Sequence, residues 1–499
     1  MAILEDERMQ KLGALDANFL YSETPRNPNH VASLQKFELP GGTDAGDFVS
    51  GLKAFMAARI HLVPYLARKI QFIPGGFDHP VWVTADNFDI NDHIEEVKLP
   101  GTGNDHQLEN CIADIHSQLM DRSKPLWKLV VITGLQDGYI AFYNQVHHAC
   151  IDGMAGQAAT QILMDTTPDH PTHVPPTGFP CAEKPGLSDL YISSIQNLVN
   201  TQLNSALSFF NGVDSLARIT QRIIDPSKSF GAVLESAPDT IFNKSIGNKR
   251  SFAFGELPLD DVKVTGKSVG CTVNDVFLAI CAGGLRKYLQ RIHELPNHSL
   301  IAGCPVSLRK PGDDGMDNQV TMMSVSLATD ITDPRLRLLA IKDSAETAKE
   351  VTADFTGSYD PDIALPGLPL VSSTAALIAD QLNTADLFAM PINVVISNVP
   401  GPRETLYANG ARMLTHYPVS VPAHGLGLNI TVQSYRDTLY FGVTACKKAL
   451  PDAALLREDM LEAYRELKLL LPEKKVTELN TGVIPTLATS AVVPIDQVA

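Results

Sequence analysis

Two adjacent histidines followed by an aspartate and a glycine are the strongest chemical signal in the sequence. The run is His147-His148-Ala149-Cys150-Ile151-Asp152-Gly153. Imidazole is the side chain whose ordinary pKa lies nearest neutral pH, so it can accept a proton and return it within one reaction cycle. A hydroxyl is a weak nucleophile until a base takes its proton. The run therefore predicts that His148 activates a hydroxyl for attack on an acyl group.

The other residues of the run have more than one interpretation. A carboxylate with a pKa of ~3.9 is too weak a base for this task, so we expect Asp152 to fix the loop and orient the histidine. Asp152 could equally cap a helix that begins near residue 154, and His147 could be a buried core histidine. Gly153 would let the chain turn tightly. Nothing near Cys150 indicates a lowered thiol pKa, so we interpret it as a packing residue.

The elements around the run indicate where it sits. Residues 126–133 and 139–146 are β-branched and apolar, and Gln136-Asp137-Gly138 between them has turn chemistry. This pattern predicts an antiparallel hairpin. A helical period begins at about residue 154. The histidines are therefore expected in the connection from a strand to a helix.

Strand and helix patterns recur along the whole chain, which predicts an α/β (α+β) fold with two domains of roughly 200 residues each. We expect an N-terminal lobe over 1–165 and a C-terminal lobe over 236–475. Six prolines between 166 and 185 indicate a linker, which crossover helices extend to residue 235. The tail, 476–499, is expected to be mobile. Further helices are predicted at 48–60, 108–120, 272–292 and 455–471, and strands at 31–39, 81–83, 300–307, 320–327, 392–397, 428–434 and 438–444.

Composition excludes several classes of protein. The net charge of −16 and the lack of a basic run argue against nucleic acid as a partner. Seven scattered cysteines without a C-x-x-C pair predict neither a zinc site nor a disulfide framework. The start of the chain is acidic and has no apolar core, unlike a signal peptide, and no stretch approaches ~18 apolar residues. We expect a reduced, cytoplasmic protein.

The run from His147 to Gly153 resembles the signature of the chloramphenicol acetyltransferase-like superfamily, which includes non-ribosomal condensation domains and plant acyltransferases. More specifically, the chain resembles the bacterial wax ester synthase/diacylglycerol acyltransferases, from about Gly13 to Leu471. Further landmarks stand in the order of that family: Pro125-Leu126-Trp127, Asn274-Asp275-Val276, Pro305-Val306-Ser307-Leu308-Arg309 and Ser397-Asn398-Val399-Pro400-Gly401-Pro402. Asn29-His30-Val31-Ala32 fits the family's opening more loosely.

The resemblance implies two similar lobes of mixed sheets flanked by helices, with a tunnel for the active site between them. It implies acyl-CoA as donor and a fatty alcohol or diacylglycerol as acceptor, without a metal, a cofactor or a covalent acyl-enzyme. His148 would be the general base and His147 its neighbour in the pocket. Such a protein could contact a membrane or a lipid inclusion peripherally.

Several landmark residues also have structural explanations. Thr272 and Asp275 have the spacing of a helix capping box, and Asn274 beside them could face the active site. Trp127 is expected in the core. Related enzymes pair an arginine with the motif aspartate, which makes Arg309 a candidate partner of Asp152.

Two alternative functions stay open. One is an acyltransferase of the same superfamily with a different hydroxyl acceptor, such as a polyketide or a sugar alcohol. The other is a catalytically silent lipid-binding protein. The presence of both histidines, Asp152 and Gly153 weighs against the silent protein.

Overall fold

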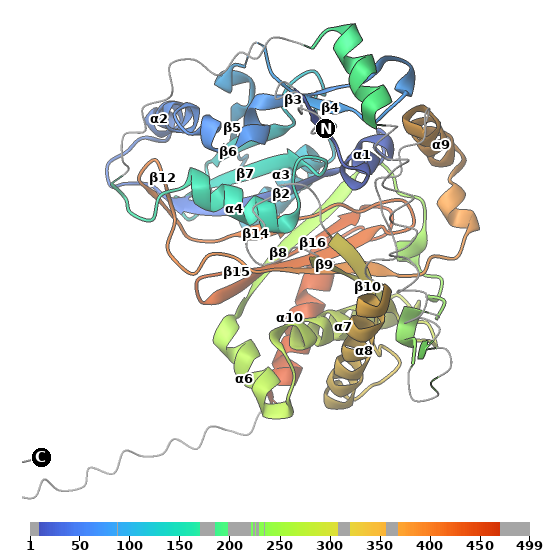
Figure 1. Ribbon diagram of the computed structural model, residues 1–499. Coiled ribbons are helices and arrows are strands. Elements are labelled where there is room, and N and C mark those ends of the chain that lie inside the picture. Colours follow the sequence, from blue (N-terminus) through green and yellow to red (C-terminus); the bar gives the residue numbers. More distant parts are fainter. Residues whose placement is uncertain are drawn as a thin grey trace, which may run out of the picture.

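Two lobes stacked on each other make up the protein, and a sheet lies in each (Figure 1). The computed structural model describes residues 9–86, 88–169, 185–197, 221–222, 225, 229–233, 235–307, 320–355 and 368–469. Most of the expected linker and the whole expected tail lie outside these residues. The α/β fold class predicted from the sequence is confirmed.

A seven-stranded sheet forms the centre of the N-terminal lobe, in the order β12-β13-β2-β7-β6-β5, with β14 also paired to β2. A smaller sheet of order β1-β4-β3 lies beside it. The helices and strands of this lobe are β1 (Gln10–Lys11), α1 (Ala14–Tyr21), β2 (His30–Glu38), α2 (Ala45–Ala57), β3 (Arg68–Gln71), β4 (Val81–Thr84), β5 (Ile94–Lys98), α3 (Asp105–His116), β6 (Trp127–Thr133), β7 (Ile140–His147) and α4 (Gly153–Leu163).

The C-terminal lobe contains a six-stranded sheet of order β10-β9-β11-β15-β16-β8, with helices α7, α8 and α10 packed together below it (Figure 1). Its elements are β8 (Arg250–Pro258), α6 (Leu259–Val269), α7 (Val273–Arg291), β9 (Ile301–Ser307), β10 (Val320–Ser326), α8 (Pro334–Phe355), α9 (Leu368–Leu382), β11 (Val394–Val399), β15 (Leu428–Tyr435), β16 (Thr438–Cys446) and α10 (Ala453–Leu469). Short 3-10 helices lie at Ile60–Leu62, Pro64–Ala67, Pro74–Gly76, Ile90–Asp92, Gly231–Val233, Ile241–Asn243 and Thr384–Leu387.

The hairpin predicted before the two histidines is confirmed. Strands β6 and β7 pair antiparallel, and Gly138 in their turn has a φ of 79°, a conformation that favours glycine. The β2 strand pairs with the other edge of β7, so that His30 lies opposite His147. This pairing brings the segment before β2 next to the end of β7, where the chain leaves the sheet.

One segment crosses from the second lobe to the first. After β11 the chain forms β12 (Tyr407–Ala408), β13 (Ala411–Met413) and β14 (Tyr417–Val419), which belong to the N-terminal sheet, and then returns as β15. Buried side chains of this segment, including Met413 and Tyr417, therefore pack in the core of the N-terminal lobe. The crossing joins the two lobes around the space between their sheets.

None of the described helices is by itself sufficiently long and apolar to cross a membrane. The pair α6 and α7 reaches that length and composition together, with a bend of 99° at the break between them.

Candidate active site

A cavity of about 1410 Å³ lies between the lobes. From the first lobe it is lined by parts of α1, β2, β7 and α4, and from the second by parts of β9, β10, β11 and α9. The crossing segment around β14 completes the lining. Pockets for drug-sized ligands usually measure ~300–1,000 Å³. This cavity is therefore larger than a typical pocket of that kind.

His148 lines this cavity, one residue after β7 ends. Its backbone N–H donates a hydrogen bond to the carbonyl oxygen of Asn29, at 2.9 Å. Its ring stacks on the ring of Phe19 from α1, with centroids 4.1 Å apart and an angle of 5° between the planes. Both the backbone and the imidazole plane are therefore fixed by the segment that precedes β2.

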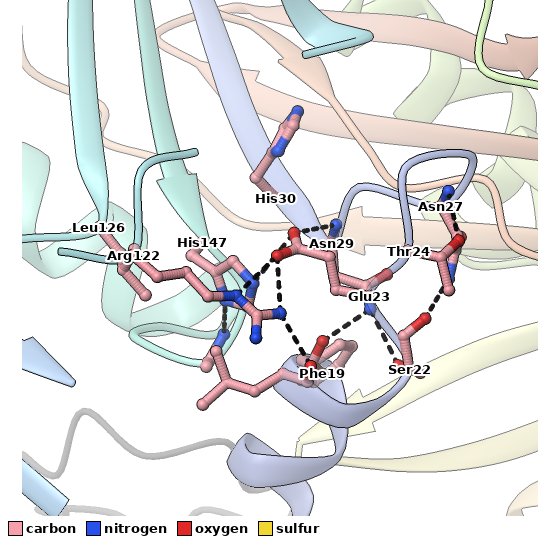
Figure 2. Close-up of polar contacts among 12 residues, drawn as sticks. Phe19, Ser22, Glu23, Thr24, Asn27, Asn29, His30, Arg122, Leu126 and His147 are labelled. Atoms are coloured by element: carbon pink, nitrogen blue, oxygen red, sulfur yellow. Dashed lines mark hydrogen bonds and ion pairs between the residues drawn. The ribbon is translucent and has the colours of Figure 1, made fainter. Parts of the chain in front are cut away.

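His147 has a different environment. Its side chain is fully buried, and it is not among the residues that line the cavity. The backbone N–H of Ala149 donates to its Nδ1 at 3.1 Å, and its Nε2 lies 3.3 Å from Oε1 of Glu23 (Figure 2). Both ring nitrogens of His147 thus lie against groups inside the protein, whereas the neighbouring His148 lines the cavity.

Asp152 is buried and occupies the N-cap position of α4. Its Oδ1 accepts a hydrogen bond from the backbone N–H of Ala155, at 2.8 Å. The capping interpretation is therefore confirmed, and it places the carboxylate at the positive end of the helix. Asp152 also lines the cavity. Its expected partner Arg309 lies outside the described residues, so the proposed ion pair stays a prediction.

Gly153 follows at the first position of α4. A β-carbon added there would lie 3.1 Å from Cγ2 of Val399, at the end of β11 in the other lobe. The glycine is thus needed for a close approach between the lobes. The sequence suggested a tight turn instead, but the structure gives Gly153 no positive φ.

The landmark Asn274-Asp275 lies at the start of α7, and the predicted capping box is confirmed. Thr272 and Asp275 exchange two hydrogen bonds, of 2.8 and 3.2 Å. Asn274 is not among the cavity-lining residues, but its Oδ1 accepts from Nδ2 of Asn398 at 3.3 Å, and Asn398 lines the cavity. Asn274 is therefore one residue removed from the site.

Two further residues singled out in the sequence pack in the core of the first lobe. The indole N–H of Trp127 donates to the carbonyl oxygen of Leu66, at 2.8 Å, as expected for a buried tryptophan. Cys150 is buried, and this burial raises the pKa of its thiol. A raised pKa disfavours the thiolate, which agrees with the interpretation of Cys150 as a packing residue.

Sequence reasoning missed Glu23 and Phe19, both of which contact the histidine pair. Neither belongs to a short motif, and a glutamate in a loop is usually solvent-exposed. It also missed His416, which lines the cavity between the amides of Gln35 and Gln433. Burial lowers the pKa of His416 to about 3, so the ring is neutral at physiological pH. Among the residues that the structure describes, no group of His, Cys, Asp or Glu could hold a metal ion.

Comparison with known proteins identifies the family. The model of the wax ester synthase/diacylglycerol acyltransferase catalytic domain matches residues 12–277, and that of the family's C-terminal domain matches residues 316–468. The chain belongs to this family. It is accordingly an acyl-CoA-dependent acyltransferase.

Relatives of this acyltransferase match over nearly its whole length. A Mycobacterium tuberculosis protein that carries the provisional name diacylglycerol O-acyltransferase is 34% identical over 92% of this chain and 99% of its own. The solved wax ester synthase/diacylglycerol acyltransferase from Marinobacter aquaeolei is 29% identical and superposes with a TM-score of 0.65, covering 92% of this chain and 99% of that one. The starter condensation domain of rhizomide synthetase, at 12% identity and a TM-score of 0.55, shares the fold.

Proposed function

We propose that this acyltransferase moves a long-chain acyl group from acyl-CoA to the hydroxyl of a fatty alcohol or a diacylglycerol. The observation that carries the proposal is the position of His148, whose ring is held against Phe19 at the wall of a large cavity between the lobes. Diacylglycerol as acceptor is also supported by the names of the mycobacterial relatives.

In the proposed reaction His148 is the general base. Its imidazole takes the proton of the acceptor hydroxyl while that oxygen attacks the thioester carbonyl. The tetrahedral intermediate then expels the CoA thiolate, which recovers the proton from His148, so that ester and free CoA leave. The transfer is direct and needs no resident cofactor or metal. The buried ring of His147 supports this choice of base, because it does not face the cavity.

Asp152 is proposed to hold the loop that carries His148. Its carboxylate fixes the first turn of α4 through the N–H of Ala155, which defines where the loop ends. An ion pair with Arg309 would add a second fixed point. Removing one partner of such a buried pair typically costs ~3–5 kcal/mol of stability.

We further propose that the enzyme is cytoplasmic and contacts a lipid surface through α9. This helix exposes Leu370 and Val371, which are 62% and 64% accessible, while Ala376 and Ala379 line the cavity. Asp380 is the one charged residue in its sequence and is buried in contact with an arginine of the other lobe. An uncharged apolar face of this kind suits contact with lipid. The six cysteines in the described part of the chain are free thiols, which suits a reducing compartment.

The proposed reaction is tested with purified protein and radiolabelled long-chain acyl-CoA, offered together with hexadecanol or diacylglycerol. We expect ester formation, and we expect His148→Ala to reduce turnover by about 10²–10⁴-fold without unfolding the protein. His106→Ala, on the exposed face of α3, is the matched control and should retain full activity.

Each alternative gives a different result in this assay. Binding of acyl-CoA without transfer to any hydroxyl would identify a silent lipid-binding protein. Transfer to other hydroxyl compounds, but to neither lipid acceptor, would identify a different superfamily enzyme. A folded His148→Ala variant that retains more than about a tenth of the rate would reject His148 as the base.

A further inference from the structure

Glu23 lies in the connection between α1 and β2, and only 3% of its side chain is exposed. Its Oε1 accepts a hydrogen bond from the backbone N–H of Asn29 at 3.0 Å and lies 3.3 Å from Nε2 of His147 (Figure 2). Its Oε2 accepts two hydrogen bonds from the guanidinium of Arg122, at 3.0 and 2.8 Å. One carboxylate thus joins the segment before β2 to two residues far along the chain, Arg122 and His147.

The hydrogen bonds of His147 determine where its proton sits. Because the backbone N–H of Ala149 donates to Nδ1, that nitrogen carries no proton. The ring proton is therefore on Nε2, which lies 3.3 Å from Oε1 of the Glu23 carboxylate. Burial alone would raise the pKa of Glu23, but its contacts with His147, Arg122 and Asn29 lower that pKa to about 2. The carboxylate is consequently ionised and accepts on both oxygens.

The same network reaches His148 from two sides. The Asn29 backbone donates its N–H to Glu23, and its carbonyl oxygen accepts the N–H of His148 at 2.9 Å. The side-chain amide of Asn29 donates to the carbonyl oxygen of Phe19 at 2.7 Å, and the ring of Phe19 stacks on that of His148. Glu23 itself is not among the cavity-lining residues. Because Glu23 does not reach the cavity, any effect that it has on the reaction must come through the position of His148.

We propose that Glu23 is a positioning residue for His148. It holds His147 in the tautomer with the proton on Nε2 and fixes the Asn29 backbone to which His148 is bonded, while Arg122 keeps its carboxylate in place. This inference rests on the proposed function only where a rate is measured. A general base gains its advantage from correct placement, and a misplacement of about 1 Å can cost about 10²-fold in rate.

Two double variants separate positioning from simple charge balance, because removing Glu23 alone would leave a buried Arg122 unpaired. Glu23→Leu with Arg122→Met removes both charges and every acceptor that Asn29 and His147 use. Glu23→Gln with Arg122→Met also removes both charges but keeps one amide oxygen that can accept from Asn29 and His147. The two proteins are matched in charge and nearly matched in volume.

We expect the Leu/Met protein to lose about 10- to 100-fold in kcat, with KM for acyl-CoA nearly unchanged, and the Gln/Met protein to recover most of that loss at a similar melting temperature. Equal rates in the two proteins would overturn the proposal, because the acceptor oxygen would then have no role. A loss that appears in KM and not in kcat would overturn it as well.

The tautomer of His147 gives a readout that needs no turnover. In the wild-type protein labelled with ¹⁵N-histidine, the imidazole shifts should show the proton on Nε2 of His147. A neutral ring with its proton on Nδ1 would contradict the contact with Glu23. Absence of acyl transfer by the wild-type protein would refute the proposed function instead, and the NMR result would still decide the contact.

Discussion

Replacement of Gly153 by alanine tests whether the two lobes meet as closely as the structure indicates. The added β-carbon would lie 3.1 Å from Cγ2 and 3.7 Å from Cγ1 of Val399. Carbon atoms in contact normally lie ~3.5–4.0 Å apart, so one of the two elements must move by a few tenths of an ångström. Gly153 begins α4 and Val399 ends β11, so this movement separates the lobes at the wall of the cavity.

Two opposing contributions set the expected change in stability. Alanine is better than glycine in a helix by up to about 1 kcal/mol. Overpacking of a close contact costs about 1–3 kcal/mol. Gly153→Ala should therefore lower the free energy of unfolding by roughly 0–3 kcal/mol. In a Val399→Ala background the overpacking disappears, because both γ-carbons are gone, and the same change should stabilise by up to about 1 kcal/mol.

The sign reversal is measured by urea unfolding of the wild type, both single variants and the double variant. Gly156→Ala is the matched control in the same helix, since its β-carbon would lie 3.6 Å from Ile151, an ordinary contact. It should stabilise equally in both backgrounds. Turnover should fall in Gly153→Ala and recover in part when Val399 is also alanine. If Gly153→Ala changes the free energy of unfolding by the same amount in the wild type and in the Val399→Ala protein, the close approach between the lobes is refuted.

Two further predictions concern pH and lipid. Because the pKa of Glu23 is lowered from 4.5 to about 2, its contribution to stability, about 3 kcal/mol, is complete above pH 4.5 and is lost as the pH falls toward 2. The difference in unfolding free energy between the wild type and the Glu23→Leu/Arg122→Met protein should therefore shrink over that range, and a constant difference would contradict the lowered pKa. Leu370→Ser with Val371→Ser should weaken co-sedimentation with phosphatidylcholine vesicles that contain diacylglycerol, whereas Leu336→Ser, on the exposed surface of α8, should not. Equal binding of the vesicles by the Leu370→Ser/Val371→Ser protein and by the Leu336→Ser protein would exclude α9 as the lipid contact.

The sequence predicted the parts of the site that depend on neighbouring residues. The hairpin of β6 and β7, the start of α4 and the cap at Asp152 follow from alternation, turn residues and helix period, all of which are local. The capping box of α7 was predicted for the same reason. The resemblance placed His148 in a cavity between two lobes, which no local pattern could have done.

The contacts across the chain could not be predicted in this way. Glu23 meets a histidine 124 positions later only because β2 pairs with β7, and a glutamate before a strand carries no signal of that pairing. The crossing of β12 to β14 into the first sheet consists of strands of two or three residues, too short for a periodic pattern. Helix α9 has an apolar outer face and an inner face of small residues, so its sequence does not indicate which side is buried.

The two lobes are therefore not separate units joined by a cleft. The first lobe supplies His148 and the residues that contact it, but Gly153 packs against Val399 of the second lobe, and β14 of the crossing segment pairs with β2 beside the site. A change in the distance between the lobes would act on α4, whose first turn Asp152 fixes, and through α4 on the loop that carries His148. If the proposals hold, the position of His148 depends on contacts within the first lobe through Glu23 and on contacts between the lobes through Gly153. These two sets of contacts share no residue, so their effects on turnover should be separable.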